Sequence, residues 1–425
     1  MIESERQARV RKSTSLHLAM EAAETLRQIT EFPDNPESMA YFYDLYQSRF
    51  KDGMILPQNG KKLVGTMCLQ VPDELIVAAG AVPVRLCSGA YAFDQAGGDF
   101  MPAKSCPLVR ATMGMLQVNN DTMKDNLSTI VIPTTCDQKR SSVEMLRNMD
   151  YPVTVLEMPA SKESDEARTY WQESVKQFAL SIQKTCGRKI TAKALNAAVR
   201  TKLEAGKLFR SLQQLRTESH PVILGKDIWL VSNSYFFDDP DQWCKAVGKL
   251  IAELDSRKSA GFSAINRKAP RLLFTGSPPI FPNLKLPILV EQAGGLVVAD
   301  ETCSSERLLH DAVVFDEKNL NDMVPAIADR YLKPCTCPCL TPNTDRAKKI
   351  LELVKSSRVE GVVYQAFSGC LPYEMEQRGI SDMLSREGVP MLFVETDYSP
   401  EDQGQLSTRV EAFIESIKVR KRKKQ

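Results

Sequence analysis

The eleven cysteines of this sequence are its residues with the clearest capacity for chemistry. Three of them are close together in Cys335-Thr-Cys337-Pro-Cys339, a segment that prolines keep out of a helix. Residues two apart in an extended chain share a face, so at least two of these sulfurs can converge on one centre. Because the N-terminus lacks a signal segment, we expect a cytoplasmic protein with reduced thiols. Reduced thiols in this number favour metal ligation or redox work.

Five more cysteines lie at the ends of predicted helices or strands. Cys136, Cys303 and Cys370 each come just after an apolar run that is typical of a strand, which is where α/β proteins place ligand sites. Cys68 and Cys106 each precede a predicted helix, and a helix N-terminus lowers the pKa of a thiol. These five thiols are therefore candidate metal ligands together with the Cys335–Cys339 segment.

The remaining cysteines, Cys87, Cys186 and Cys244, lie in an apolar strand or in helices, where we expect small buried side chains. Zinc sites favour paired ligands such as C-x2-C or two histidines, and the sequence has neither that spacing nor more than three histidines. Iron-sulfur clusters can be held by thiolates from distant segments, and ligation by sulfur alone selects them.

The elements that position these thiols form two similar series. Apolar runs bounded by turn residues alternate with helical patterns, which predicts parallel strands joined by crossover helices. The fold class expected is α/β, with two Rossmann-like domains that have open parallel sheets. The predicted strands are residues 81–87, 128–133, 152–158, 271–275, 295–299, 361–366 and 390–395.

A chain of 425 residues is too long for one ordinary core, and we expect several domains. A basic run, KVRKRKK at 418–424, is expected to be a solvated tail after the last helix. The expected division is a helical N-terminal arm (1–55), a first α/β domain (56–163), a helical spacer (164–265), a second α/β domain (266–418) and a basic tail (419–425). The net charge of +2 favours neither nucleic acid nor a membrane as a partner.

Seven segments of the sequence resemble, in order, the signature segments of the 2-hydroxyacyl-CoA dehydratase and benzoyl-CoA reductase family. The resemblance covers roughly residues 60 to 415. The segments are CLQVPDELIVAAGAVPVRL, CPLVRATMG, PTTCDQKR, VADETCSSER, CPCLTPNTDR, GVVYQAFSGCLPYEME and PMLFVETDYSPEDQGQLSTRVEAFIE.

The resemblance implies an iron-sulfur cofactor. An ordinary subunit of this family holds one 4Fe-4S cluster on three cysteines, which correspond here to Cys106, Cys136 and Cys370. The additional thiols make the chain similar to the double-cubane cluster proteins of the family, homodimeric reductases in which two linked 4Fe-4S units need six ligands. The candidate metal ligands implied are Cys68, Cys106, Cys136, Cys303, Cys337, Cys339 and Cys370.

These candidates are one more than a double cubane needs. The spare thiol is expected to be Cys337, Cys339 or Cys68. Cys335 departs from the family pattern, which usually has an apolar residue there, and is expected to be adventitious.

The resemblance also implies a partner, a separate ATP-dependent iron-sulfur activator that donates low-potential electrons. The chain fits the recipient role, since it has no G-x-x-x-x-G-K-[ST] phosphate loop. Candidates for proton delivery to a small-molecule substrate are carboxylates near the thiols, although helix capping is the more typical role at such positions. They are Asp137, Glu301, Glu374 and Glu376.

Three functions remain open at this point. The first is an activator-dependent, low-potential oxidoreductase that reduces a small molecule with a double cubane. The second is a subunit of a 2-hydroxyacyl-CoA dehydratase or benzoyl-CoA-type reductase with one 4Fe-4S cluster. The third is a non-catalytic electron-storage protein. A metal-free α/β protein would be colourless, whereas each of these would contain iron.

Overall fold

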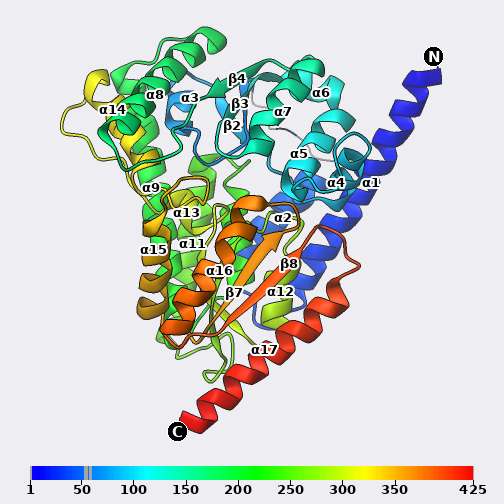
Figure 1. Cartoon of the computed structure of the whole chain (residues 1–425), viewed down its shortest axis with the longest axis vertical. Coiled ribbons are helices and arrows are strands. Elements are labelled where there is room, and N and C mark those ends of the chain that lie inside the picture. Colours follow the sequence, from blue (N-terminus) through cyan, green and yellow to red (C-terminus); the bar gives the residue numbers. More distant parts are fainter. Residues whose placement is uncertain (1, 52–55, 57–59, 425) are drawn as a thin grey trace.

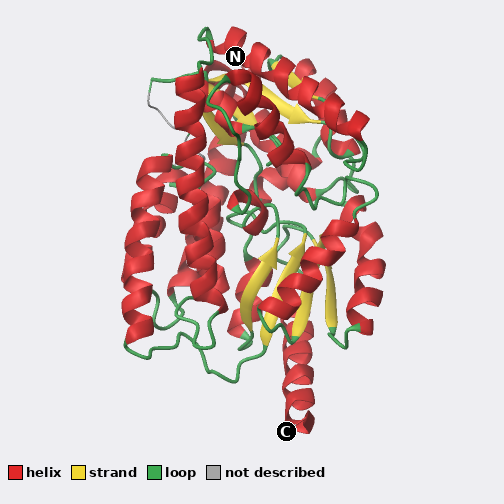
Figure 2. Ribbon diagram, turned by 90° about the vertical axis from the view of Figure 1, so that its left-hand side faces the viewer, coloured by secondary structure: helices red, strands yellow, loops and turns green. Residues whose placement is uncertain are grey.

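The computed structural model describes residues 2–51, 56 and 60–424 of the chain (Figure 1). It contains two four-stranded parallel sheets, one formed by each half of the sequence. Figure 2 shows the two sheets one above the other, with long helices beside them. The predicted α/β fold with two Rossmann-like domains is confirmed.

The N-terminal half begins with helices and then forms the first sheet. Its elements are α1 (Ile2–Thr30), a 3-10 turn (Glu37–Met39), α2 (Ala40–Phe50), β1 (Leu63–Thr66), α3 (Asp73–Ala78), β2 (Val82–Arg85), α4 (Tyr91–Gly98), α5 (Pro107–Val118), α6 (Asn120–Asn126), β3 (Leu127–Pro133), α7 (Asp137–Asn148) and β4 (Val153–Leu156).

Four helices separate the sheets in the sequence, and the second sheet follows. The separating helices are α8 (Asp165–Cys186), α9 (Ala192–Thr217), α10 (Gly225–Ser234) and α11 (Pro240–Ser259). The later elements are β5 (Arg271–Gly276), α12 (Lys285–Gln292), β6 (Leu296–Glu301), α13 (Glu306–Leu309), α14 (Leu320–Leu332), α15 (Thr344–Ser356), β7 (Gly361–Phe367), α16 (Leu371–Arg386), β8 (Met391–Thr396) and α17 (Gln403–Lys424).

Both sheets have the same strand order, β2-β1-β3-β4 and β6-β5-β7-β8, and all their strand pairs are parallel. In each sheet the order reverses beside the first strand, and ligands of open α/β sheets bind beyond the carboxyl ends of the strands at such a point. The loops that follow β1, β3 and β7 carry Cys68, Cys136 and Cys370.

The strand β1 was not among the predicted strands, although it lies inside the first sheet. It is only four residues long and contains Gly65, which weakens the sequence pattern of a strand. The position needs a glycine, because a Cβ atom there would lie 2.6 Å from Leu86 Cδ1. The close packing that selects Gly65 is therefore tertiary.

Alternate residues of the strands face different cores. In the second sheet, Leu272 and Phe274 face a central core that both halves of the chain share, whereas Leu273 faces an outer core. In the first sheet, Leu63 and Val64 divide in the same way between the central core and a second outer core. Because the central core includes residues of both sheets, the two halves pack as one body.

Helix α1 links the two halves of the molecule. The Glu21 carboxylate accepts hydrogen bonds from the backbone N–H groups of Tyr91 and Ala92 at the start of α4. One turn later, the Thr25 hydroxyl donates to the Pro282 carbonyl of the second half, at 2.9 Å. The expected helical arm therefore packs against both halves of the chain. The boundary expected at residue 55 falls outside the described residues.

Three elements differ from the expectations. Helix α14 follows β6 in sequence but packs against α8, in the outer core of the first sheet, and Trp171 Nε1 of α8 donates to the Ala328 carbonyl of α14 at 2.8 Å. Helix α10, which was expected only as an unspecified part of the helical spacer (164–265), is buried on every side and therefore has no amphipathic pattern. The basic run at 418–424 lies within α17 instead of following it, and Lys421 pairs with Glu360 at 2.8 Å.

The remaining domain boundaries stay predictions. In the part of the chain that the structure describes, every helix is too short or too polar to cross a bilayer.

Candidate metal centre

Three of the predicted ligands are N-cap residues of helices. Cys136 caps α7 just after β3, and Cys370 caps α16 just after β7. Cys106 caps α5, which has Pro107 as its first residue. A thiol at this position lies at the positive end of the helix dipole, which favours the thiolate form.

Eight cysteines line a single cavity beyond the carboxyl ends of strands from both sheets, and we call it the thiol cavity. It contains all seven predicted ligands and, in addition, Cys335. The lining thiols belong to Cys68, Cys106, Cys136, Cys303, Cys335, Cys337, Cys339 and Cys370. The structure therefore brings the predicted thiols together, while their binding of metal stays a prediction.

A first group of thiols consists of Cys106, Cys136 and Cys370. A hydrogen bond between Cys106 and Cys370 lowers the pKa of the Cys106 thiol and raises that of Cys370. Cys136 interacts electrostatically with both. A hydrogen bond with Cys339 lowers the pKa of Cys136 to about 6. These three are the thiols that the resemblance predicts as ligands of one 4Fe-4S cluster.

A second group consists of Cys68, Cys303, Cys335 and Cys337, in which Cys303 and Cys335 each interact electrostatically with Cys68 and Cys337. Burial raises the pKa of Cys303 to about 12 and that of Cys335 to about 12. A hydrogen bond with Cys339 lowers the pKa of Cys337 to about 6. Because the Cys339 thiol is hydrogen-bonded to both Cys136 and Cys337, it links the two groups.

The charged side chains of the cavity lining are mainly cations. They are Lys139, Arg307 and Arg330, with Asp311 as the acidic residue of the lining. Burial alone would lower the pKa of Lys139, but the thiolates of Cys68 and Cys136 raise it well above its usual value. Lys139 therefore stays charged, and the cavity favours an anionic occupant.

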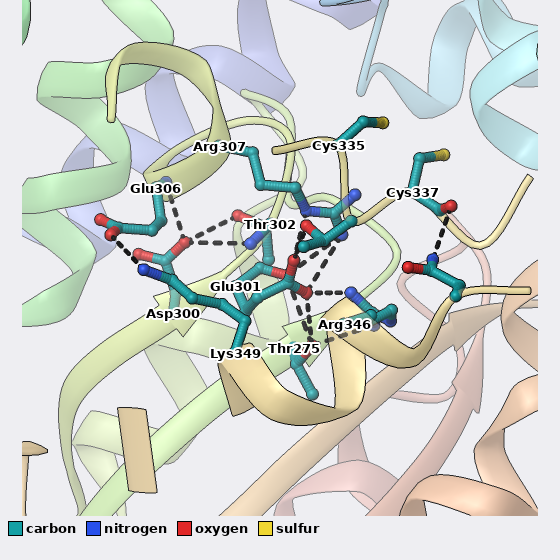
Figure 3. A network of polar contacts seen from close by, with 12 residues as sticks. Thr275, Asp300, Glu301, Thr302, Glu306, Arg307, Cys335, Cys337, Arg346 and Lys349 are labelled. Atoms are coloured by element: carbon teal, nitrogen blue, oxygen red, sulfur yellow. Dashed lines mark hydrogen bonds and ion pairs between the residues drawn. The ribbon is translucent and has the colours of Figure 1, made fainter. Parts of the chain in front are cut away.

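Glu301, the last residue of β6, is the centre of a buried polar network beside the second thiol group (Figure 3). Arg307 Nε lies 2.7 Å from its Oε1 atom, and Arg346 pairs with its Oε2 atom. The Thr336 hydroxyl donates to Oε1 at 2.6 Å. Since Thr336 lies between Cys335 and Cys337, Glu301 fixes this segment beside Arg307.

The Cys335–Cys339 segment is also bound to the first half of the chain. The side-chain amide of Gln70 donates a hydrogen bond to Cys335 Sγ, and Lys162 Nζ donates to the Cys335 carbonyl at 2.8 Å. Asn343 Nδ2 donates to the Cys337 carbonyl at 2.7 Å. These contacts and the Glu301 network hold the segment between the two halves.

The four carboxylates considered for proton delivery do not line the cavity. Glu301 is fully buried between two arginines, and Asp137 points to solvent with 95% of its side chain exposed. Glu374 accepts a hydrogen bond from the Gly369 N–H group at 2.7 Å, a capping contact. Glu376 accepts from Arg346 and Tyr364. All four therefore have structural or exposed positions.

The three cysteines that were expected to be structural lie outside the cavity lining. Cys186 ends α8 and Cys244 lies in α11, where both pack against apolar cores. Cys87 lies closer to the site, since it interacts electrostatically with Cys68, and burial raises its pKa. Its Sγ atom is 3.7 Å from the Met67 carbonyl.

Sequence reasoning missed the cations of the cavity and gave Cys335 no role there. Their positions relative to the cysteines carry a signal: Lys139 follows Cys136 by three residues, one turn into a helix, and Arg307 follows Cys303 by four. Lys139 therefore lies in the first turn of α7, which Cys136 caps, whereas Arg307 belongs to the short helix α13 that follows Cys303. Tyr373 was also missed, and its hydroxyl accepts a hydrogen bond from Arg307 at 2.8 Å.

The donors of the cavity fit an iron-sulfur cluster. Among the described residues, no group of histidine, cysteine and carboxylate side chains has an arrangement that could hold a single metal ion. The lining instead provides many thiols, without a histidine, around a cavity. A cluster takes its thiolates from separate directions because they bind different irons, and sulfur ligands select iron-sulfur chemistry over hard cations.

Comparison with known proteins places this architecture in a family. The family model described as 2-hydroxyglutaryl-CoA dehydratase, D-component, matches residues 68–417. The chain is 30% identical over 386 residues to the "Putative dehydratase subunit YjiM" of Escherichia coli (strain K12), an alignment that covers 90% of this chain and 99% of that protein.

Two further relatives have more specific names. The beta subunit of (R)-2-hydroxyglutaryl-CoA dehydratase from Acidaminococcus fermentans is 24% identical, with 84% of this chain and 93% of the relative aligned. A benzoyl-CoA reductase subunit from Thauera aromatica is 24% identical, with 84% and 92% aligned. With a family model that matches most of its length, the chain belongs to the 2-hydroxyglutaryl-CoA dehydratase D-component family.

Proposed function

We propose that this chain is an iron-sulfur redox enzyme of the 2-hydroxyacyl-CoA dehydratase type, and that its thiol cavity holds a double-cubane cluster. The observation that carries the proposal is the convergence of all seven predicted ligands in one cavity. The division of the thiols into two groups joined at Cys339 supports two linked cubanes over one. Each group offers at least three thiols, which is the number needed per cubane.

When bound, the cluster would supply low-potential electrons to a small substrate. The ligands proposed are Cys106, Cys136 and Cys370 for one unit and Cys68, Cys303 and Cys337 for the other. Cys339 is then the spare thiol, because it lies between the groups. Lys139 and Arg307 provide positive charge beside the thiolates.

The electrons would come from a separate ATP-dependent iron-sulfur activator. This part of the proposal is supported by the relatives, which are named as subunits of dehydratases and of a reductase. In the double-cubane arrangement the chain would act as a homodimer in the cytoplasm, without nucleic acid or membrane partners.

The alternative enzyme, a dehydratase or reductase subunit with one 4Fe-4S cluster, is favoured by one observation. Cys106, Cys136 and Cys370 already form a complete three-thiol group. In that case the second group would hold no iron. The distinction between the two enzymes is therefore a matter of how much iron each chain contains.

Determination of iron and acid-labile sulfide on anaerobically purified protein tests the proposal. We expect about eight irons per chain, with an electron paramagnetic resonance signal on reduction. About four irons per chain would instead favour the single-cluster enzyme, and colourless, iron-free protein would end both. Cluster reduction by the activator and ATP, without turnover of any small substrate, would favour electron storage.

A further inference from the structure

The position of Lys139 in the thiol cavity is unusual for a lysine. It lies in the first turn of α7, three residues after the N-cap Cys136. The N-terminus of a helix carries partial positive charge, so a cation in this turn is locally unfavourable. Nothing in the local sequence compensates for it, because Asp137 is exposed and pairs weakly with Arg140 at 3.9 Å.

The other cations of the lining have partners that Lys139 lacks. Arg307 is paired with Glu301 and donates to Tyr373, and Arg330 donates to the carbonyls of Leu308 and Asp311. Within the described residues, the Lys139 ammonium group has no carboxylate within ion-pair distance and no hydrogen bond, although the backbone N–H of Lys139 bonds to Cys136. The Lys139 side chain is half-buried in the cavity lining, so the thiols and any anion in the cavity are the charges that face its ammonium group.

The electrostatic partners of Lys139 are thiols of both groups. Cys136 belongs to the first group, whereas Cys68 and Cys303 belong to the second. The ammonium group therefore interacts with thiols of both groups. By contrast, Arg307 interacts with Cys303 and Cys337, which both belong to the second group.

We propose that Lys139 is a positioning residue for electron uptake, whose fixed positive charge in the lining of the thiol cavity raises the reduction potential of the cluster. The inference rests on the proposed function. Uptake of one electron, supplied by an external low-potential reductant, makes the occupant of the cavity more negative by one charge. A nearby cation stabilises that reduced form more than the oxidised form, because the attraction grows with the negative charge.

The test is anaerobic redox titration of the purified, cluster-loaded protein with dithionite and mediators, followed by electron paramagnetic resonance. The variants are Lys139→Met, which removes the charge, and Lys139→Arg, which keeps it. We expect the equilibrium constant for reduction of the cluster to be at least tenfold lower in Lys139→Met than in the wild type. This corresponds to a reduction potential lower by 59 mV for a one-electron couple. Lys139→Arg should stay close to the wild-type potential.

Arg140→Met is the matched control. Arg140 is the next residue of the same helix and has the same charge, but 64% of its side chain is exposed and it does not line the cavity. Water and salt screen its charge, so its removal should leave the potential unchanged. If Arg140→Met lowered the potential as much as Lys139→Met, the effect would be one of net charge and the proposal would be wrong.

The remaining outcomes also decide the question. Loss of iron from Lys139→Met with retention in Lys139→Arg would support the role of the charge. An unchanged potential in Lys139→Met, or loss of iron from both variants, would overturn it. Iron-free wild-type protein would instead refute the proposed function itself, so the two failures are distinguishable.

Discussion

At the level of single residues, the cysteine thiols differ in their hydrogen bonds and in whether they line the thiol cavity. The Cys370 thiol is hydrogen-bonded to Cys106, which caps a helix in the other half of the chain. Cys186, by contrast, ends α8 and lies outside the lining of the thiol cavity. We therefore expect the Cys370 thiol to bind iron and the Cys186 thiol not to bind it.

Replacement of Cys370 by serine should remove iron. A serine hydroxyl is a poor ligand for iron-sulfur iron, so Cys370→Ser should lose about half of the iron or more, since one of the two cubanes lacks a thiolate. Iron and labile sulfide per chain measure the loss. Cys186→Ser is the matched control and should keep the wild-type content; equal iron in both variants would exclude Cys370 as a ligand.

The ion pairs of Glu301 are expected to contribute to the stability of the folded chain. Its carboxylate is fully buried and balances both Arg307 and Arg346. Glu301→Gln leaves two buried guanidinium groups without that charge, and we expect a loss of about 3 kcal/mol or more in the free energy of unfolding. Urea denaturation provides the measurement.

An exposed glutamate at a comparable position is available as the control for this change. Glu395 lies near the end of β8 in the same sheet and its side chain is exposed. Glu395→Gln should alter the free energy of unfolding by no more than about 0.5 kcal/mol. A similar small effect of Glu301→Gln would show that the ion pairs contribute little.

At the level of elements, the turn between β7 and α16 determines where Cys370 lies. Gly369 has a φ of +81°, and a Cβ atom there would lie 2.1 Å from the Lys104 carbonyl oxygen. Lys104 lies two residues before Cys106, so this contact brings two segments that carry thiols together. The turn requires glycine for both its backbone conformation and its close packing.

Gly369→Ala should therefore separate the two segments. We expect a lower iron content and a destabilisation of at least about 1 kcal/mol from the left-handed backbone alone. The control is Gly379→Ala within α16, where a Cβ atom would meet nothing within 4 Å. Alanine should stabilise that helix by up to about 1 kcal/mol and leave iron unchanged. Full iron content in Gly369→Ala would contradict the proposed packing constraint.

The N-terminus of the buried helix α10 depends on a carboxyl group. Glu291 accepts hydrogen bonds from the N–H groups of Gly225 and Lys226, at 2.7 and 3.0 Å. Burial raises the pKa of Glu291 from 4.5 to about 7, so the folded protein keeps this proton where the unfolded chain has lost it. The stabilisation it provides is complete below pH 4.5 and disappears as the pH rises through 7.

We expect deprotonation of Glu291 to reduce the free energy of unfolding by about 3 kcal/mol as the pH rises from 4.5 to 7.5. Glu291→Gln cannot lose a proton, so its stability should decline less over this range. Urea denaturation of both proteins at several pH values measures the difference. Parallel pH profiles for the variant and the wild type would show that Glu291 does not titrate in this range.

At the level of the whole molecule, the two halves meet in three ways. They share a central core, α1 bonds to both of them through Glu21 and Thr25, and the thiol cavity takes cysteines from both. A cluster bound to these cysteines would cross-link the halves. Its binding free energy would then be part of the stability of the whole chain.

Removal of iron by a chelator under anaerobic conditions should therefore lower the Tm of the protein. Calorimetry of the loaded and stripped forms measures the change. The Cys370→Ser variant, which should hold less iron, is expected to show a smaller decrease on stripping. Identical Tm values before and after removal of iron from the wild type would mean that the cluster does not cross-link the halves.

The sequence alone determined the strand and helix pattern, and hence the α/β class, because alternating apolar runs and helical periods are local signals. It also determined which cysteines lie at element ends, because those ends are marked by glycine and proline. Long apolar strands such as β3 and β7 were predicted almost to the residue, whereas β1 was missed because its identity as a strand depends on contacts with its neighbours.

Only the tertiary structure decided which groups share the site. Three of its features join residues that are far apart in the sequence. Glu301 contacts Thr336 and Arg346, and α14 packs in the first half of the chain. Lys139 interacts with thiols of both groups. The physical reason is that electrostatic energy depends on distance and burial, and neither quantity is encoded by local residue patterns.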